Sequence, residues 1–307
     1  MKKLFLSALL LLPGAALAQF DPASLAKVQV KSSAVAGNVH MLEGAGGNIG
    51  VSSGPDGILI VDDQFEPLVP KIREALGKLT KGKNKKPEYV LNTHWHFDHT
   101  GSNAVFGREG TIVAHKHVRT RLLNGLESAA LGMKIPPAPK EALPVITYDQ
   151  GLSIFFNGEE IQVTHLPAGH TDGDSIVYFT GSNVLHMGDL FTGEKYPFID
   201  LESGGSLEGY LRNVEQVLQT LPAGVKIIPG HGAISGREGL ENVAGMLRDT
   251  VALVKGKLAA GKTLEQVKAE GMPEKYKSWG DGFIKPDQWL TIAYQSLSGQ
   301  KPGATKK

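Results

Sequence analysis

The chain has 307 residues, of which 41% are hydrophobic and 21% charged, and this is the composition of an ordinary globular protein. Its net charge of +1 excludes the strongly basic surface that is typical of proteins that bind nucleic acid or anionic membranes, so we expect neither partner. Cysteine is absent, which excludes disulfide bonds and thiolate metal ligands. Any metal would therefore be bound by His, Asp or Glu.

The first eighteen residues, 1–18, have the pattern of a secretory signal peptide. Lys2 and Lys3 precede an apolar run over 4–12, and Ala16-Leu17-Ala18 forms a small-residue cleavage site. The apolar run is shorter than the roughly 20 residues of a membrane-spanning helix. We expect cleavage after Ala18, a periplasmic or secreted mature chain, and no stable membrane insertion after cleavage; an uncleaved anchor is the alternative. Losing two lysines lowers the net charge from +1 to −1.

The first half of the mature chain predicts short strands followed by helices. The glycine-rich stretch 44–50 reads as a hairpin loop. Apolar spacing predicts helices over 67–79 and 116–123. The expected strands are 39–42, 48–52, 58–61, 89–91 and 111–114.

The second half repeats this mixture after a proline-rich stretch, 125–150, that we expect to be a loop. Helices are predicted over 207–221, with Ser206 as the N-cap, and over 240–258. The expected strands are 153–156, 161–166, 176–180, 183–186 and 225–228. We therefore predict a single α/β domain over 19–307 whose two halves each supply sheet and helix, with a C-terminal helical extension over about 237–307.

Metal chemistry is indicated first by Thr93-His94-Trp95-His96-Phe97-Asp98-His99, which directly follows a predicted strand. On an extended segment His94 and His96 point the same way, because side chains alternate. Neutral imidazoles and a carboxylate suit zinc, manganese or iron. One short loop could not enclose two ions, so further ligands would have to come from the ends of other strands.

Three later positions could supply such ligands. His170 lies in Leu166-Pro167-Ala168-Gly169-His170-Thr171, Asp189 in His186-Met187-Gly188-Asp189, and His231 in Pro229-Gly230-His231-Gly232. Each follows a predicted strand and stands beside a glycine, which allows close approach of backbone and metal. Each alone is more simply a hydrogen-bonded loop residue, but the three together with the first cluster favour a metal site.

The order of these motifs resembles the metallo-β-lactamase superfamily, and most of all its glyoxalase II-type members: HxHxDH comes first, followed by GHT, GD and GHG. The resemblance runs from about His40 to Gly232 and includes the strand Gly57-Ile58-Leu59-Ile60-Val61-Asp62. It implies a four-layer αββα sandwich with two divalent metal ions at one edge of the two sheets, zinc as the first choice and iron or manganese as alternatives. It further implies one metal on His94, His96 and His170, a second on Asp98, His99 and His231, and Asp189 as the bridge.

Two departures from related patterns refine the expectation. Some zinc β-lactamases have a cysteine where Asp189 stands, and the di-iron redox members replace the second histidine by glutamate where this chain keeps His96. Both differences favour a hydrolytic site of glyoxalase II type without excluding a β-lactamase. A glutathione thioester is discounted as the substrate, because a secreted protein would rarely meet it.

The resemblance implies a small-molecule hydrolase in which a metal-bridging hydroxide attacks the carbonyl of an ester, lactone, thioester or amide. Asp98 is the candidate catalytic residue, as the proton acceptor beside the nucleophile. Candidates for orienting the ligating histidines are Asp62, Thr171, Asp172 and Asp174. The other histidines, at 40, 115, 117, 165 and 186, are expected to be structural or superficial.

The substrate pocket is expected to form from the loops 44–50, 125–150 and 191–205, with Trp95 and Phe97 either lining it or packing the turn. Three alternatives stay open: a metallo-β-lactamase, an oxidoreductase resembling persulfide dioxygenases with a single iron, and a non-catalytic metal- or ligand-binding protein. The intact set of candidate ligands argues against the last. Neither the substrate nor the oligomeric state can be read from the sequence.

Overall fold

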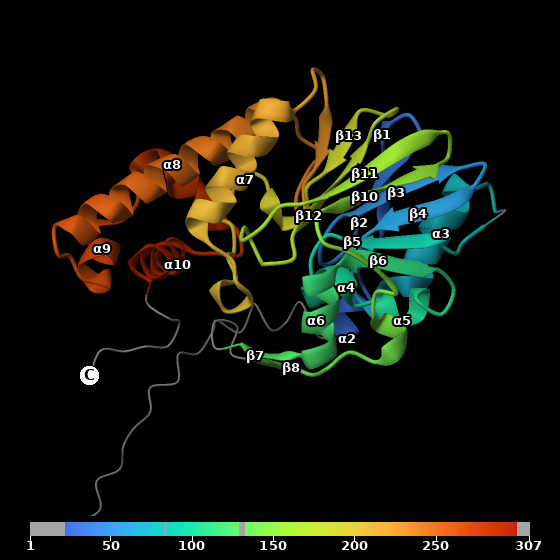
Figure 1. Ribbon diagram of the computed structural model, residues 1–307, viewed down its shortest axis with the longest axis horizontal. Helices are drawn as coiled ribbons and strands as arrows, with labels where there is room; N and C mark the ends of the chain where they lie inside the picture. The colour runs from blue at the N-terminus through green and yellow to red at the C-terminus, as the bar shows by residue number, and fades with distance from the viewer. Residues whose placement is uncertain (1–21, 83, 129–132, 300–307) are drawn as a thin grey trace, which may run out of the picture.

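The structure, a computed structural model, describes residues 22–82, 84–128 and 133–299. The predicted signal peptide lies outside these residues. Two β-sheets stand face to face in the centre, and helices cover both outer faces (Figure 1). This confirms the predicted four-layer αββα sandwich.

The first sheet has seven strands in the order β1-β2-β3-β4-β5-β6-β9. Neighbours are antiparallel from β1 to β4 and parallel from β4 to β9. The strands are β1 (Lys31–Ala36), β2 (Val39–Glu43), β3 (Ile49–Gly54), β4 (Gly57–Val61), β5 (Tyr89–Asn92), β6 (Thr111–His115) and β9 (Ile146–Tyr148).

The second sheet has five strands in the order β10-β11-β12-β13-β14, antiparallel except for the parallel pair β13 and β14. They are β10 (Gly151–Phe156), β11 (Glu159–His165), β12 (Ser175–Phe179), β13 (Val184–His186) and β14 (Lys226–Ile228). Every strand predicted from the sequence is present within a few residues. In these two sheets, the predictions omitted β1 and β9.

Helices follow the strands along the chain. The α-helices are α2 (Pro22–Leu25), α3 (Val69–Leu79), α4 (Phe97–Thr100), α5 (Asn103–Phe106), α6 (Lys116–Asn124), α7 (Leu207–Thr220), α8 (Arg237–Ala259), α9 (Leu264–Glu270) and α10 (Pro286–Ser298). The 3₁₀ helices are η1 (Glu66–Leu68), η2 (Lys140–Ala142), η3 (Gly188–Leu190), η4 (Leu201–Ser203) and η5 (Glu274–Asp281). The Ser206 side chain accepts a hydrogen bond from Gly209 N, which confirms this residue as the N-cap of α7. Within the described residues, no helix is both long and apolar enough to cross a membrane.

Alternating side chains join the four layers. In β4, Ile58 and Ile60 pack in the cluster beneath α3, whereas Leu59 and Val61 pack in the cluster between the two sheets. In β14, Ile227 faces the helices over the second sheet and Ile228 faces the first sheet. Strands buried on both faces read as continuous apolar runs, and this is how they appeared in the sequence.

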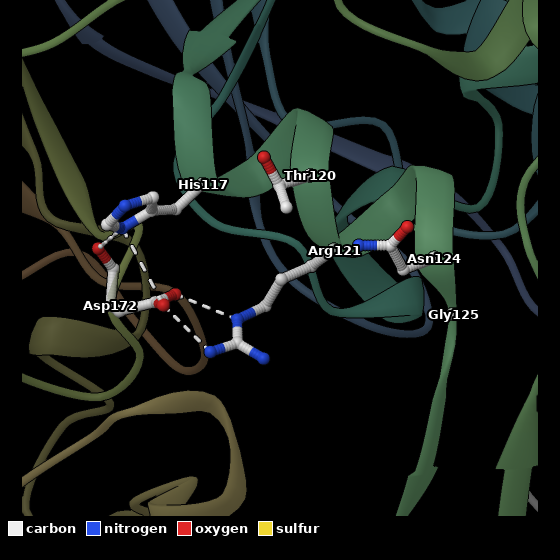
Figure 2. Close-up of a pocket in the computed structure, with 6 residues that line it drawn as sticks. All are labelled: His117, Thr120, Arg121, Asn124, Gly125 and Asp172. Atoms are coloured by element: carbon white, nitrogen blue, oxygen red, sulfur yellow. Dashed lines mark hydrogen bonds and ion pairs between the residues drawn. The ribbon is translucent and has the colours of Figure 1, made fainter.

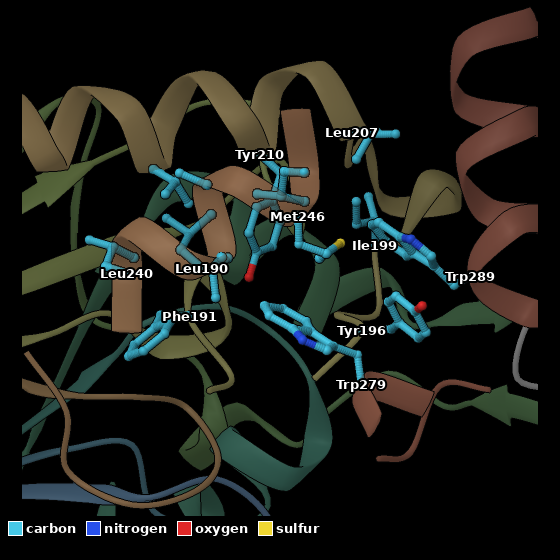
Figure 3. Packing of buried hydrophobic residues seen from close by; sticks show 14 of the residues in the cluster. Leu190, Phe191, Tyr196, Ile199, Leu207, Tyr210, Leu240, Met246, Trp279 and Trp289 are labelled. Atoms are coloured by element: carbon cyan, nitrogen blue, oxygen red, sulfur yellow. The ribbon is translucent and has the colours of Figure 1, made fainter. Parts of the chain in front are cut away.

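The second sheet is covered by α7, α8 and α10, and aromatic side chains fill the space between them and the sheet (Figure 3). Tyr196 stacks on Trp289 with ring centroids 5.6 Å apart. Tyr210, on α7, donates its hydroxyl to the Asp189 backbone carbonyl at 2.7 Å. The helical layer therefore holds the turn after β13 in place.

The stretch predicted as one long loop, 125–150, is more ordered than expected. It contains the hairpin of β7 (Leu126–Ser128) and β8 (Met133–Ile135), and then β9, which pairs in parallel with β6. The prediction missed these strands because each has only three residues, which is too few to show a period. Residues 129–132 of the loop lie outside the described part.

Candidate metal centre

All seven residues predicted to bind metal lie in one cluster at one edge of the sandwich. They follow strand ends: β5 leads to His94, β11 to His170, β13 to Asp189 and β14 to His231. Their ring nitrogens and carboxylate oxygens form three groups, each within 4.8 Å. The groups are His94 with His96 and His170, His94 with His99 and Asp189, and Asp98 with His99 and His231.

His94 is oriented by a buried chain of hydrogen bonds. Thr93 donates its hydroxyl to Asp62 Oδ2 at 2.7 Å, so its oxygen accepts from His94 Nδ1 at 3.0 Å. The lone pair of His94 therefore lies on Nε2, which is buried and has no hydrogen-bond partner among the described residues. Asp62 is held in turn by Thr93 N, and it adopts a φ of 64° to reach these groups.

His96 and His170 are fixed by acceptors on the segment after β13. Asp200 Oδ2 lies 2.9 Å from His96 Nε2, and the Phe198 carbonyl lies 2.7 Å from His170 Nδ1. Both acceptors require the imidazole nitrogen to donate, so the opposite nitrogens carry lone pairs. These opposite nitrogens, His96 Nδ1 and His170 Nε2, lie 2.8 Å apart. Two lone pairs at this separation repel unless a cation lies between or beside them.

The second group is more polar and more open. His99 Nδ1 lies 2.7 Å from Asp62 Oδ2, which leaves Nε2 directed toward His231 Nε2 at 3.3 Å. Asp98 Oδ2 lies 3.3 Å from His231 Nε2 and 3.6 Å from His99 Nε2. The His231 side chain is 38% exposed, whereas His99 is fully buried. This side of the cluster is therefore reachable from solvent.

Asp189 lies between the two groups and divides its oxygens between them. Its Oδ1 is 3.2 Å from His99 Nε2 and 3.4 Å from His231 Nε2, and its Oδ2 is 3.7 Å from His170 Nε2. A side chain at Gly230 would collide with Asp189 Oδ1, and one at Gly47 would collide with the His99 ring. Glycine at both positions therefore permits the close packing of the cluster.

Protonation behaviour separates the two groups. Burial holds the pKa of His94 well below its usual value and lowers that of His170 to about 4. Burial also opposes the charged form of His231, but Asp189 and Asp98 outweigh it and raise its pKa to about 10. The pKa of His99 is likewise well above normal, because nearby carboxylates outweigh the effect of burial. Protons would thus compete with a metal ion for the nitrogens of the second group.

The donor set fits a metal ion. A buried histidine nitrogen without a partner, two lone-pair nitrogens facing each other and two carboxylates form the nitrogen and oxygen environment of zinc or a similar ion. Four of the five histidines, His94, His96, His99 and His170, make hydrogen bonds through their other nitrogens, as metal-ligating histidines do.

The residues predicted to orient the ligating histidines differ in the contacts that they make. Asp62 contacts His99 and Thr93 as expected. Asp174 instead accepts from Thr171 N and Thr171 Oγ1, which shapes the turn after His170. Asp172 pairs with Arg121 and, within the described residues, forms no hydrogen bond or ion pair with the seven candidate ligands. Trp95 packs in an apolar cluster beneath α6, so it packs the turn and does not line a pocket.

Sequence reasoning missed Asp200, the Phe198 carbonyl, Thr93 and Tyr210. Asp200 is 104 residues from His96 and stands in no motif. The only available signal was its place in the segment 191–205, which was expected to lie over the metals. Three of the remaining histidines make structural contacts: His186 accepts from Gly188 N and contacts the Asn48 carbonyl, and the His115 ring stacks on the His165 ring.

Comparison with known proteins agrees with this geometry. The family model described as the metallo-beta-lactamase superfamily matches residues 37–231. The chain belongs to the metallo-β-lactamase superfamily. Of curated relatives, a beta-lactamase-like protein 2 homolog of Drosophila melanogaster is 29% identical over 184 residues, which are 60% of this chain and 57% of the relative. A probable metallo-hydrolase of Methanocaldococcus jannaschii is 31% identical over 170 residues, 52% of this chain and 77% of the relative.

A metallo-beta-lactamase from Pontibacter korlensis has a similar structure, with a TM-score of 0.55 and 19% identity over 72% of this chain and 100% of that chain. At this identity the likeness concerns the fold. The chain spans little more than half the length of the Drosophila relative. The protein has the fold of the metallo-β-lactamase superfamily and a histidine-rich cluster able to bind metal.

Proposed function

We propose that the protein is an exported di-metal hydrolase that cleaves an ester, lactone, thioester or amide of a small molecule. The position of Asp189 carries this proposal, since its two oxygens face two different groups of histidines. One ion would be held by His94, His96 and His170, and the other by Asp98, His99 and His231. Zinc is the first choice for both because the donors are imidazole and carboxylate.

When bound, the two ions would supply an activated water nucleophile and polarise a carbonyl oxygen. Asp98 is the residue of the cluster best placed to take up a proton, since its side chain is 21% exposed beside the accessible His231. Asp62, Thr93 and Asp200 would hold the imidazoles in the tautomers that leave lone pairs facing the ions.

Metal analysis of the purified mature protein tests the proposal together with hydrolysis of a panel containing an ester, a lactone, a thioester and a cephalosporin. About two zinc ions per chain and turnover of one class would support it, and turnover of the cephalosporin alone would assign a β-lactamase. One iron per chain with oxygen uptake and no hydrolysis would overturn it in favour of the oxidoreductase.

Asp98→Ala tests the proton-acceptor role. We expect this variant to lose turnover while its melting temperature stays within a few degrees of the wild type. Wild-type kcat in the variant would remove Asp98 from the mechanism.

Export is tested separately by mass spectrometry of the protein recovered from a Gram-negative host. An N-terminus at Gln19 in the periplasmic fraction is expected. A chain that keeps residues 1–18 would contradict the export proposal and leave the hydrolase proposal intact.

A further inference from the structure

A cavity of about 270 Å³ lies between α6 and the turn that follows His170 (Figure 2). Its lining is polar and comes from two segments far apart in the sequence. The lining residues are His117, Thr120, Arg121, Asn124, Gly125 and Asp172.

Helix α6 presents one face to this cavity and the opposite face to the core. His117, Arg121 and Asn124 are spaced as neighbours on one side of a helix. Val118 and Leu122 pack on the other side in the apolar cluster that contains Trp95. The polar face is therefore not needed to anchor α6 to the sandwich.

Arg121 holds its guanidinium in a fixed orientation across the cavity. Nε lies 2.8 Å from Asp172 Oδ1 and Nη2 lies 2.7 Å from Asp172 Oδ2. This bidentate pair uses two of the five N–H donors of arginine. Figure 2 shows the third nitrogen pointing away from Asp172, and the guanidinium is partly exposed. A ligand at this point must bring hydrogen-bond acceptors, because arginine has none.

The formal charge of the cavity lining is zero, because Asp172 balances Arg121. Asp172 offsets one positive charge, and His117 Nδ1 donates to the Asp172 backbone carbonyl at 2.9 Å, which leaves Nε2 as a second polar atom. The Asn124 amide adds a neutral polar group. Asp172 repels a singly charged carboxylate less than a doubly charged phosphate, and the remaining N–H groups of Arg121 can donate to that carboxylate.

The cavity and the metal cluster share one loop. Asp172 follows His170 by two residues, so their Cα atoms are at most about 7 Å apart. Asp172 N donates to the Ser203 carbonyl, Ser203 N donates to Asp200 Oδ1, and Asp200 contacts His96. The same turn therefore places a ligand in the cavity relative to the first group of histidines.

We propose that this cavity binds a carboxylate of the substrate through Arg121, so that the natural substrate is a carboxylate-bearing ester, thioester or amide. This inference rests on the proposed hydrolase function. It adds a substrate class that the metal cluster itself does not define.

A matched pair of esters tests the inference on the metal-loaded protein. One is the aryl monoester of glutaric acid, which has a free carboxylate. The other is the aryl ester of butyric acid, which has none. In Arg121→Gln we expect the ratio of kcat/KM for the charged ester to that for the neutral ester to fall about tenfold or more, mainly through KM, because hydrogen bonds to charged groups contribute about that much.

Lys116→Gln is the matched control, since it removes a positive charge from the same helix at a residue that pairs with Asp149 outside the cavity. The ratio should stay at its wild-type value in this variant. An unchanged ratio in Arg121→Gln, or an equal fall in both variants, would overturn the inference.

Calorimetric titration with glutarate gives a readout that does not depend on hydrolysis. All variants keep the metal cluster, so a difference between them reports the cavity alone. We expect glutarate to bind wild type and Lys116→Gln equally and Arg121→Gln about tenfold more weakly. If neither ester is hydrolysed but this difference appears, the hydrolase proposal fails and the carboxylate site stands. Equal binding to all three would refute the site.

Loss of Arg121 could also unfold the turn that it braces. If Arg121→Gln lacks a cooperative melting transition, Arg121→Lys is the deciding variant, because it keeps the charge next to Asp172 and loses the planar fork. Weaker glutarate binding by this folded variant supports the carboxylate site, and wild-type binding contradicts it.

Discussion

The two groups of candidate ligands differ in burial, charge and protonation although they share Asp189. The group of His94, His96 and His170 is buried, and its members have ordered acceptors on their far nitrogens. The group of Asp98, His99 and His231 contains a carboxylate and opens to solvent at His231. A preorganised set of buried nitrogens should bind a metal without rearrangement. The open group must release protons first.

Because the two groups differ, two ions bound there should not be equivalent. The buried group resembles a structural metal site, because its ligands are closed off from solvent. The open group has the accessible position at which a substrate could approach. Three variants and a change of pH test whether the two groups differ in this way.

Removing the shared residue should have the largest effect. Asp189→Asn replaces one oxygen by an amide nitrogen, so one of the two groups loses its carboxylate contact. We expect metal content to fall by about one ion per chain and kcat/KM to fall at least about a thousandfold, because water loses the activation that a paired site provides. Metal analysis and steady-state kinetics measure both.

Tyr210→Phe is the control for this variant, since it removes only the hydrogen bond to the Asp189 backbone carbonyl. It should lower kcat/KM less than about tenfold. Full activity and two ions in Asp189→Asn would mean that the groups do not share this residue.

Acidity should separate the groups next. A histidine with a raised pKa is protonated below that pKa, and a protonated nitrogen cannot bind metal. The pKa of His231 is about 10 and that of His99 is well above normal, so the affinity of the open group should fall as pH falls through the neutral range. Displacing two protons costs about a hundredfold in affinity per pH unit.

The buried group should keep its ion to a much lower pH, because the pKa of His170 is about 4 and that of His94 is well below normal. Metal content after dialysis at limiting zinc between pH 8 and pH 5 should therefore fall from two ions toward one. Parallel loss of both ions would contradict the distinction.

Much of this arrangement could be predicted from the sequence, and the reason is local. His94, His96, Asp98 and His99 are adjacent in the chain, and His170, Asp189 and His231 each stand beside a glycine after an apolar strand. The αββα layers were predictable in the same way, because strands such as β4 and β14 are continuous apolar runs. Whether the seven residues bind two ions stays a prediction.

The parts that could not be predicted depend on contacts distant in sequence. Asp200 reaches His96 across 104 residues, and Arg121 reaches Asp172 across 51. Neither pair has a motif, since each depends on how two loops dock after the sheets have formed. The strand β9 was missed because three residues give too little periodicity, and its partner β6 supplies the pairing.

Asp200→Asn should weaken only the buried group. The negative charge of Asp200 favours the tautomer of His96 that donates from Nε2. The amide keeps the size of the carboxylate but removes this charge. Loss of such an orienting partner typically lowers metal affinity about 10- to 100-fold. Competition with a chelator should show this loss for the more tightly held ion. Asp149→Asn, an exposed carboxylate paired with Lys116, should leave both affinities unchanged.

The smallest effect should come from the residue that holds the open group in place. Asn48 Nδ2 donates to the carbonyls of Pro229 and Gly232, and Asn48 N donates to the Gly230 carbonyl, so one residue clamps both sides of His231. Asn48→Ala removes two hydrogen bonds and keeps the backbone contact. Each contributes about 0.5–1.5 kcal/mol, so the affinity of the weaker ion should fall about tenfold.

The tighter ion should keep its affinity in Asn48→Ala, because no contact of Asn48 reaches the buried group in the described residues. Asn38→Ala is the matched control, since this amide donates to the Asn157 carbonyl and not to the His231 loop. The measurement is the same chelator competition, read at both ions. Equal weakening of both ions would show that the loop of His231 supports the whole cluster, and the two groups would then have to be treated as one mechanical unit.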